Sequence, residues 1–177
     1  MNLPNFLATL RILMAPLMFW FLVDRDNSIF SGWHESWLDY FAALIFVLAS
    51  VTDFFDGYIA RSWGQITKLG SILDPLADKM LMLAGFIGLV YIGRANPWAV
   101  YIILTREFFI TGLRVAMAGE GKSVSASWAG KAKTVAQMFA IGFLLMNWDY
   151  ANEILWFSVF LTIYSGYEYV RSYFWES

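Results

Sequence analysis

The 177-residue sequence contains no cysteine and a single histidine, His34. Without cysteine the chain has no disulfide bonds, no thiolate metal ligands and no cysteine nucleophile. One histidine also excludes a zinc site built from several histidines. Charged residues are scarce, at 15% against about 25% of charged residues in an ordinary soluble domain, and the formal net charge is -2. This charge argues against a nucleic-acid partner, because binding DNA or RNA requires a basic surface.

Apolar residues, in contrast, make up 59% of the chain. Because a membrane-spanning helix needs roughly 20 mostly apolar residues, the chain is long enough for about six crossings with short connections. We therefore expect an all-α integral membrane protein, a six-transmembrane-helix bundle formed by one domain over residues 1–177. The expected helices are Phe6–Val23, Trp37–Ala60, Ile72–Ile92, Trp98–Ala118, Lys131–Met146 and Ile154–Tyr173.

Lysine and arginine are distributed unevenly between the two ends of the expected helices. If the amino terminus is cytoplasmic, the outer loops hold only Arg25 and Arg94, and most other basic residues lie at the inner ends. The positive-inside rule then places both termini in the cytoplasm, with the chain in the inner (cytoplasmic) membrane. Several tryptophans fall near the outer surface and are expected to be interfacial anchors: Trp33, Trp37, Trp98, Trp148 and Trp156.

Four aspartates interrupt two of the apolar runs. Asp53 and Asp56 are three residues apart, and Asp74 and Asp78 are four apart, so each pair lies on one face of a helix. An aspartate at the centre of a membrane helix costs roughly 2.5 to 3.5 kcal/mol, so the four must be compensated. Both pairs lie near cytoplasmic helix ends, where they can converge.

Converging carboxylates repel one another unless they are protonated or bind cations. Their hard oxygen ligands suit Mg²⁺, Mn²⁺ or Ca²⁺. Two divalent ions held in this way can bind a diphosphate and stabilise the attacking and leaving oxygens of phosphoryl transfer. Small residues at Gly57 and Ala60 leave room for a ligand beside the first pair, and Arg61 can bind a phosphate at the membrane edge.

The same residues form the pattern Asp53-x2-Asp56-Gly57-x2-Ala60-Arg61-x8-Gly70-x3-Asp74-x3-Asp78. This pattern resembles, without a gap, the signature of the CDP-alcohol phosphotransferases, integral membrane enzymes of phospholipid synthesis. The resemblance implies a six-helix membrane bundle, usually a homodimer, with a site that opens to the cytoplasm. It also implies that two divalent cations, Mg²⁺ or Mn²⁺, are bound by Asp53, Asp56 and Asp74, with Asp78 as a neighbouring ligand and the general base. The implied CDP-binding residues are Asp53, Asp56, Gly57, Ala60, Arg61 and Gly70.

Basic residues in the second half of the chain bear on the acceptor. Arg106 lies inside an expected helix, where a buried arginine needs a partner, and Glu107 follows it. Arg114 lies two turns further toward the cytoplasm, and Lys131 and Lys133 begin the next helix. We predict that these four cations bind the phosphate of an anionic acceptor.

A second resemblance specifies the acceptor. Thr105–Arg114 and Ser127–Gln137, together with Asn2–Asn5 and Arg11, are similar to the branch of the family that uses sn-glycerol 3-phosphate. The implied reaction transfers the phosphatidyl group of CDP-diacylglycerol to the 1-hydroxyl of glycerol 3-phosphate. Ala8 departs from this branch, which commonly has threonine there.

Other functions stay open at this point. Within the family, the acceptor could instead be inositol phosphate, serine or another alcohol phosphate. Outside it, acidic residues in membrane helices are also found in cation and proton transporters. A transporter needs acids distributed across the depth of the membrane, whereas these cluster at one end, which favours the transferase.

Overall fold

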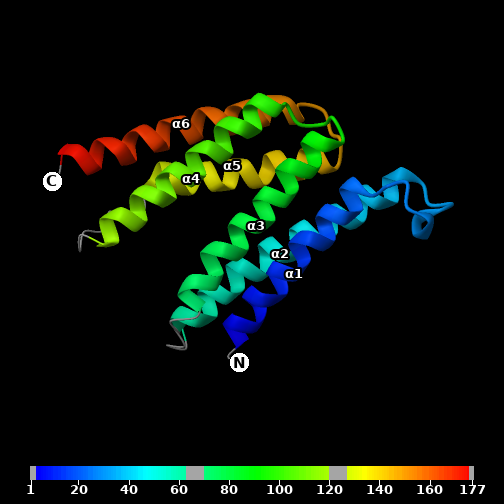
Figure 1. The fold of residues 1–177 in the computed structure, drawn as a ribbon, viewed down its shortest axis with the longest axis horizontal. Coiled ribbons are helices and arrows are strands. Elements are labelled where there is room, and N and C mark those ends of the chain that lie inside the picture. The colour runs from blue at the N-terminus through cyan, green and yellow to red at the C-terminus, as the bar shows by residue number, and fades with distance from the viewer. Residues whose placement is uncertain (1–2, 63–69, 120–126, 176–177) are drawn as a thin grey trace. The chain divides into compact units, whose positions relative to one another are not determined.

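The computed structural model describes residues 3–62, 70–119 and 127–175, and this part of the chain is helical and without strands (Figure 1). Its α-helices are α1 (Leu3–Val23), α2 (Glu35–Ser62), α3 (Gly70–Tyr91), α4 (Pro97–Gly119), α5 (Trp128–Leu145) and α6 (Ala151–Trp175), with a short 3₁₀ helix η1 (Ser28–Phe30).

The expected all-helical fold is confirmed, with boundaries close to the expected ones. Apolar runs of this length form helices because the backbone satisfies its own hydrogen bonds there. Within the described residues, two stretches are long and apolar enough to cross a membrane by length and composition, Asn5–Val23 and Glu35–Asp53. The prediction of six crossings therefore stays a prediction.

Side chains at the helix starts explain several of the boundaries. Asn96 accepts hydrogen bonds from the backbone N–H groups of Trp98 (2.9 Å) and Ala99 (3.4 Å), so it caps α4. Pro97 occupies the first position of that helix, where no N–H is needed. Ser127 caps α5 by accepting from the N–H of Gly130 at 3.1 Å.

The chain divides into two compact units, Met1–Arg94 with Leu145–Asn147, and Ala95–Leu144 with Trp148–Ser177. In the first unit, α1 packs along both α2 and α3. Gly88 on α3 permits a close approach, because a Cβ atom there would lie 2.7 Å from Cδ1 of Leu22. α1 is thus the central helix of this unit.

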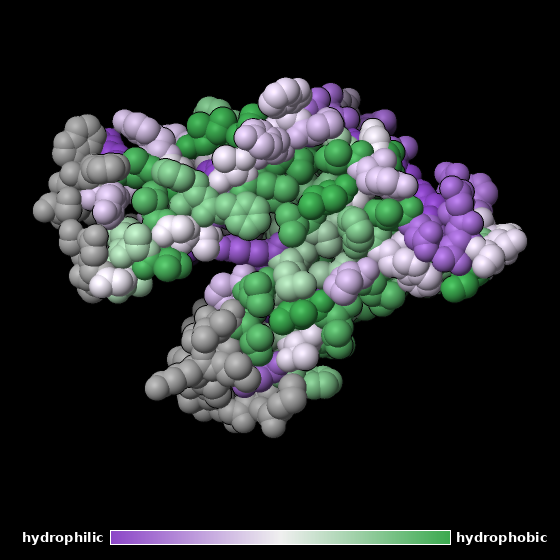
Figure 2. Space-filling view, viewed as in Figure 1, coloured by the Kyte–Doolittle hydropathy of each residue, from purple (hydrophilic) through white to green (hydrophobic). Residues whose placement is uncertain are grey.

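A polar cluster joins the connections at one end of the first unit. The carboxylate of Asp39 accepts from Arg25 at 2.5 Å and from Arg94 at 2.7 Å. Arg94 also donates to the backbone carbonyl of Leu145 at 2.8 Å. Figure 2 shows hydrophilic residues gathered around the α1–α2 connection, whereas apolar residues cover most of the visible helix surface. Many apolar side chains of the helices are exposed, among them Leu13 (63%) and Val47 (53%), as is expected of helices that contact lipid.

In the second unit, α4 packs against α6. Their contact includes the buried side chains of Ile110, Met117 and Tyr169. α5 joins α6 through a buried hydrogen bond from Gln137 to the hydroxyl of Thr162, at 3.0 Å. Polar contacts therefore supplement apolar packing between these helices, as is common in membrane bundles.

Candidate active site

The structure describes the side chains of three of the four predicted aspartates, all in the first unit. Asp53 lies on α2, and Asp74 and Asp78 lie on α3. Nη1 of Arg11, on α1, donates to Oδ1 of Asp53 at 2.5 Å and to Oδ1 of Asp78 at 2.7 Å. The side chain of Arg11 is fully buried, while those of Asp53 and Asp78 are 43% and 48% exposed. The arginine therefore lies beneath two carboxylates that a ligand can reach from outside.

These contacts bring Asp53 and Asp78 together, as predicted. α1 makes this possible because it packs between the two helices that carry them. A single cation that contacts two carboxylates reduces their mutual repulsion, so this side of the cluster is compensated by the protein itself.

Asp74 lies one turn before Asp78 on α3, and its Oδ1 atom is buried without a hydrogen-bond partner in the described part of the chain. Gly70, the first residue of α3, is buried. The side chains of Asp56, Ala60 and Arg61, and the surroundings of Gly57, lie outside the described residues, although the α2 backbone includes all four positions.

The acidic residues fit a divalent cation by their chemistry. Carboxylate oxygens are the ligands preferred by Mg²⁺ and Mn²⁺, and a buried, unpaired carboxylate oxygen such as that of Asp74 is the kind of atom that a cation satisfies. The described residues contain no group of three side chains placed to hold a metal, and the fourth predicted ligand, Asp56, is outside them. The predicted four-residue site therefore stays a prediction.

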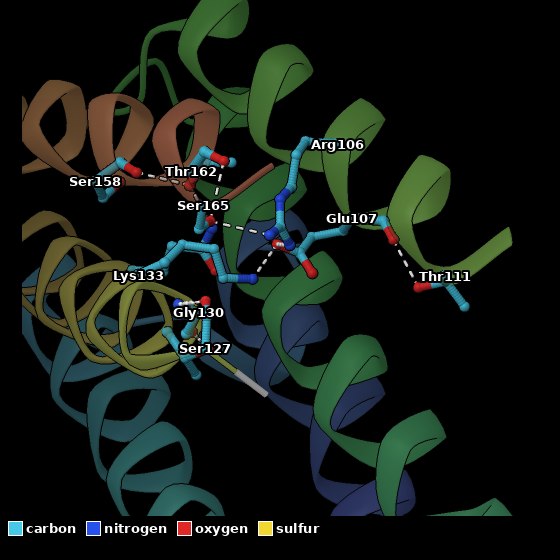
Figure 3. A network of polar contacts seen from close by, with 11 residues as sticks. Arg106, Glu107, Thr111, Ser127, Gly130, Lys133, Ser158, Thr162 and Ser165 are labelled. Atoms are coloured by element: carbon cyan, nitrogen blue, oxygen red, sulfur yellow. Dashed lines mark hydrogen bonds and ion pairs between the residues drawn. The ribbon is translucent and has the colours of Figure 1, made fainter. Parts of the chain in front are cut away.

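Basic residues of the second unit form a separate network (Figure 3). Oε1 of Glu107 accepts from Nη1 of Arg106 at 3.3 Å and from Nζ of Lys133. Nη2 of Arg106 donates to the hydroxyl of Ser165 on α6 at 2.9 Å. The side chains of Arg106 and Lys133 are 15% and 7% exposed. The sequence prediction that Arg106 needs a partner is confirmed, and Glu107 is one of its partners.

Of the four cations predicted to bind the acceptor, the network contains Arg106 and Lys133. Arg114 is exposed and lies over the ring of Tyr169, with its guanidinium carbon 5.3 Å from the ring centroid. Lys131 is exposed. It lies two residues before Lys133 on α5, and residues two apart on a helix point to different faces. Arg106 and Lys133 are both largely buried and share the carboxylate of Glu107. Together they carry one more positive charge than this carboxylate neutralises, which a phosphate could bind.

Sequence reasoning did not assign a role in the site to Arg11, Glu107 or Ser165. Arg11 falls within the apolar run Phe6–Val23, where a charge requires partners, but the sequence does not show which residues they are. Glu107 follows Arg106 directly, which indicates a partner for that arginine rather than a site residue. Ser165 gave no comparable signal, since serine in a membrane helix usually serves packing.

Comparison with known proteins agrees with this chemistry. The sequence profile of the CDP-alcohol phosphatidyltransferases matches residues 1–164. A Bacillus subtilis (strain 168) protein is 40% identical over 184 aligned residues, which cover 95% of this chain and 93% of the relative. A Rickettsia typhi protein is 39% identical and covers 97% of this chain and 96% of the relative. Both relatives carry the name CDP-diacylglycerol--glycerol-3-phosphate 3-phosphatidyltransferase.

A Mycobacterium tuberculosis (strain H37Rv) protein named probable phosphatidylglycerophosphate synthase is 37% identical and covers 96% of this chain and 80% of the relative. The profile match spans most of the residues and includes the whole aspartate pattern. The chain therefore belongs to the CDP-alcohol phosphatidyltransferase family, a family of membrane-associated enzymes that generally use divalent cations.

Proposed function

We propose that this protein transfers the phosphatidyl group of CDP-diacylglycerol to the 1-hydroxyl of sn-glycerol 3-phosphate, forming phosphatidylglycerophosphate and CMP. The observation that carries the proposal is the 40% identity to a transferase of that name, over nearly the full length of both chains. The largely buried cations Arg106 and Lys133 share a single carboxylate, that of Glu107, and this supports an acceptor whose phosphate supplies further negative charge.

In the proposed mechanism, Asp78 accepts the proton of the 1-hydroxyl. That oxygen forms a bond to the phosphatidyl phosphorus, and the bond from this phosphorus to the oxygen of CMP breaks. The half-exposed carboxylate of Asp78 supports this role, since a hydroxyl can approach it. Divalent cations, when bound, would supply charge stabilisation for the attacking and leaving oxygens.

The other site residues predicted from the sequence bind the metal ions, the donor or the acceptor in this proposal. Asp53, Asp56 and Asp74 would hold two Mg²⁺ or Mn²⁺ ions, with Asp78 as a neighbouring ligand. The cytidine diphosphate contacts Asp53, Asp56, Gly57, Ala60, Arg61 and Gly70. The phosphate of the acceptor binds Arg106 and Lys133, with Arg114 and Lys131 contributing to the positive charge around it.

The proposal extends to the membrane arrangement and the oligomeric state of the protein. Six helices span the inner (cytoplasmic) membrane, both termini and the active site face the cytoplasm, and the protein is a homodimer formed by one membrane domain per chain. The exposed apolar residues of the helices support membrane insertion. The acyl chains of the donor then stay in the lipid phase during the reaction.

The test is CMP release by the purified protein in detergent, with CDP-diacylglycerol, Mg²⁺ or Mn²⁺, and one acceptor at a time. Glycerol 3-phosphate, inositol 1-phosphate and serine are compared, each with an EDTA control. We expect release with glycerol 3-phosphate and loss of release in EDTA. Release only with inositol 1-phosphate would keep the aspartate site and overturn the acceptor, and release that resists EDTA would overturn the metal requirement.

A further inference from the structure

The side chain of Arg106 lies against one short stretch of α6. Its Nη2 atom donates to Oγ of Ser165 at 2.9 Å, and Ser165 is 1% exposed. The next residue is Gly166, where an added Cβ atom would lie 3.4 Å from both Cγ and Nε of Arg106. A methyl group there would be in ordinary van der Waals contact with the arginine, whereas a larger side chain would extend into the space that Arg106 occupies. The small size of residue 166 therefore matters for the position of Arg106.

The hydroxyl of Ser165 is oriented by its own helix. Its Oγ atom donates to the backbone carbonyl of Thr162 at 3.1 Å. A hydroxyl has one proton and two acceptor lone pairs, so with its proton used in this way the oxygen can only accept from Arg106. Figure 3 shows Ser165 on the side of α6 that faces Arg106. The contact is thus a hydrogen bond from a charged donor to an acceptor that is already fixed.

Ser165 and Glu107 together determine the plane of the guanidinium. The carboxylate of Glu107 accepts a hydrogen bond from Nη1 of Arg106 at 3.3 Å and also pairs with Lys133, so it is shared between two cations. A single shared carboxylate leaves a guanidinium free to rotate, whereas a second contact on another nitrogen fixes its plane. A guanidinium has five N–H donors, so donors remain for an anion after these two contacts.

We propose that Ser165 and Gly166 are positioning residues for the acceptor: they hold the guanidinium of Arg106 in the orientation that binds the phosphate of the alcohol phosphate. This inference rests on the proposed function and extends it to α6. The two residues follow directly after residue 164, where the match to the family profile ends. They lie outside the aspartate signature, and their role depends on a contact between helices.

The full-length protein carrying Ser165→Ala or Gly166→Leu tests the inference through steady-state kinetics with CDP-diacylglycerol and Mg²⁺. Losing a hydrogen bond to a charged group, or displacing that group, weakens binding by about tenfold. We expect the KM for glycerol 3-phosphate to rise about five- to tenfold in each variant. The kcat and the KM for CDP-diacylglycerol should stay within about twofold, since uniform binding of the acceptor alone is reduced.

Two matched controls separate positioning from general packing. Ser158→Ala removes another buried hydroxyl of α6, one that donates to the backbone carbonyl of Leu155. Gly142→Leu adds the same side chain to a helical glycine of α5 that has open space around it. Both controls should keep the KM for glycerol 3-phosphate. An equal rise of this KM in the controls, or a fall of kcat alone in the test variants, would overturn the inference.

Calorimetric titration of glycerol 3-phosphate without the CDP-lipid provides a reading that does not depend on turnover, and it should show the same fold-change in the dissociation constant. Arg106→Ala distinguishes the two levels of the proposal. If it raises the KM for glycerol 3-phosphate and the α6 variants do not, the positioning role is wrong and the acceptor site stands. If Arg106→Ala leaves this KM unchanged, the acceptor site itself is wrong.

Discussion

The two units of the molecule arrange charge in opposite ways. In the first, one fully buried cation, Arg11, contacts two carboxylates that are about half exposed. In the second, one carboxylate, Glu107, contacts two cations that are almost buried. Among the ion pairs of the described residues, carboxylates therefore outnumber cations in the first cluster, and cations outnumber carboxylates in the second.

This difference indicates what each cluster binds. Burying an uncompensated charge is costly, so an excess of charge persists where a ligand of opposite sign can complete it. The excess of carboxylates suits divalent cations, and the excess of cations suits a phosphate. In the first cluster Arg11 is the minority charge and the aspartates are the majority; in the second Glu107 is the minority charge and the cations are the majority. Variants that remove one or the other test the comparison directly.

The largest effect is expected from Asp78→Asn. The substitution keeps the size of the side chain and removes the proposed base, and general bases contribute roughly 10²- to 10⁴-fold to a rate. We expect kcat for CMP release to fall by about 10³-fold or more, while the protein elutes from a sizing column like the wild type. Residual activity above about a tenth of the wild-type rate would contradict the assignment, since a base cannot contribute so little.

The next largest effect is expected from Arg11→Met, which removes the minority charge of the first unit and keeps a long side chain. Asp53 and Asp78 then repel each other across α2 and α3. We expect the free energy of unfolding to fall by about 1–3 kcal/mol in EDTA, discounted from a fully buried pair because the carboxylates are exposed. Divalent cations can replace the lost charge, so Mg²⁺ should restore much of the stability.

The measurement for Arg11→Met is a thermal melt with and without Mg²⁺, beside the wild type. A loss of stability that is the same in Mg²⁺ and in EDTA would mean that Arg11 serves packing and has no special relation to the carboxylates. Gly88→Leu, which introduces a clash between α1 and α3 away from these aspartates, is the matched control and should lose stability equally in both conditions.

A smaller effect is expected from Lys133→Met, which removes part of the majority charge of the second unit. The methionine fills the buried space, and Arg106 keeps Glu107 as a partner. We expect the KM for glycerol 3-phosphate to rise about tenfold, the loss of one charge-assisted hydrogen bond, with little change in the KM for CDP-diacylglycerol. If the KM for the CDP-lipid rises instead, the cation cluster serves the donor and its assignment to the acceptor is wrong.

The sequence predicted the helices well because each apolar run is long and its ends are marked by polar residues, glycine or proline. The expected helix Trp98–Ala118, for example, is α4 (Pro97–Gly119) in the structure, which differs by one residue at each end. The sequence also predicted the convergence of Asp53 and Asp78, because helical spacing and opposite helix directions place both near one end of the bundle. These are local or nearly local properties.

Three contacts between side chains of different helices were not predicted. Arg11 reads as a basic residue at an inner helix end, and only the packing of α1 between α2 and α3 gives it two carboxylates. Arg114 reads as a member of the cation group, whereas the structure places it over Tyr169 on α6. Ser165 and Gly166 read as small packing residues, and their contact with Arg106 requires the register of α4 against α6.

The smallest effect is expected from Lys131→Ala. Lys131 is exposed, whereas Lys133, on a different face of α5, is buried. An exposed lysine attracts a phosphate only through a field that water and salt weaken, so the KM for glycerol 3-phosphate should rise about twofold or less at low salt. The difference from wild type should vanish at 0.5 M NaCl, where the screening length is only a few ångströms by the same scaling. The larger effect of Lys133→Met should persist there, because a buried charge is screened much less.

A tenfold rise of the KM for glycerol 3-phosphate in Lys131→Ala that survives high salt would mean that Lys131 contacts the phosphate directly. Burial would then no longer distinguish the cations that bind the acceptor from those that only attract it.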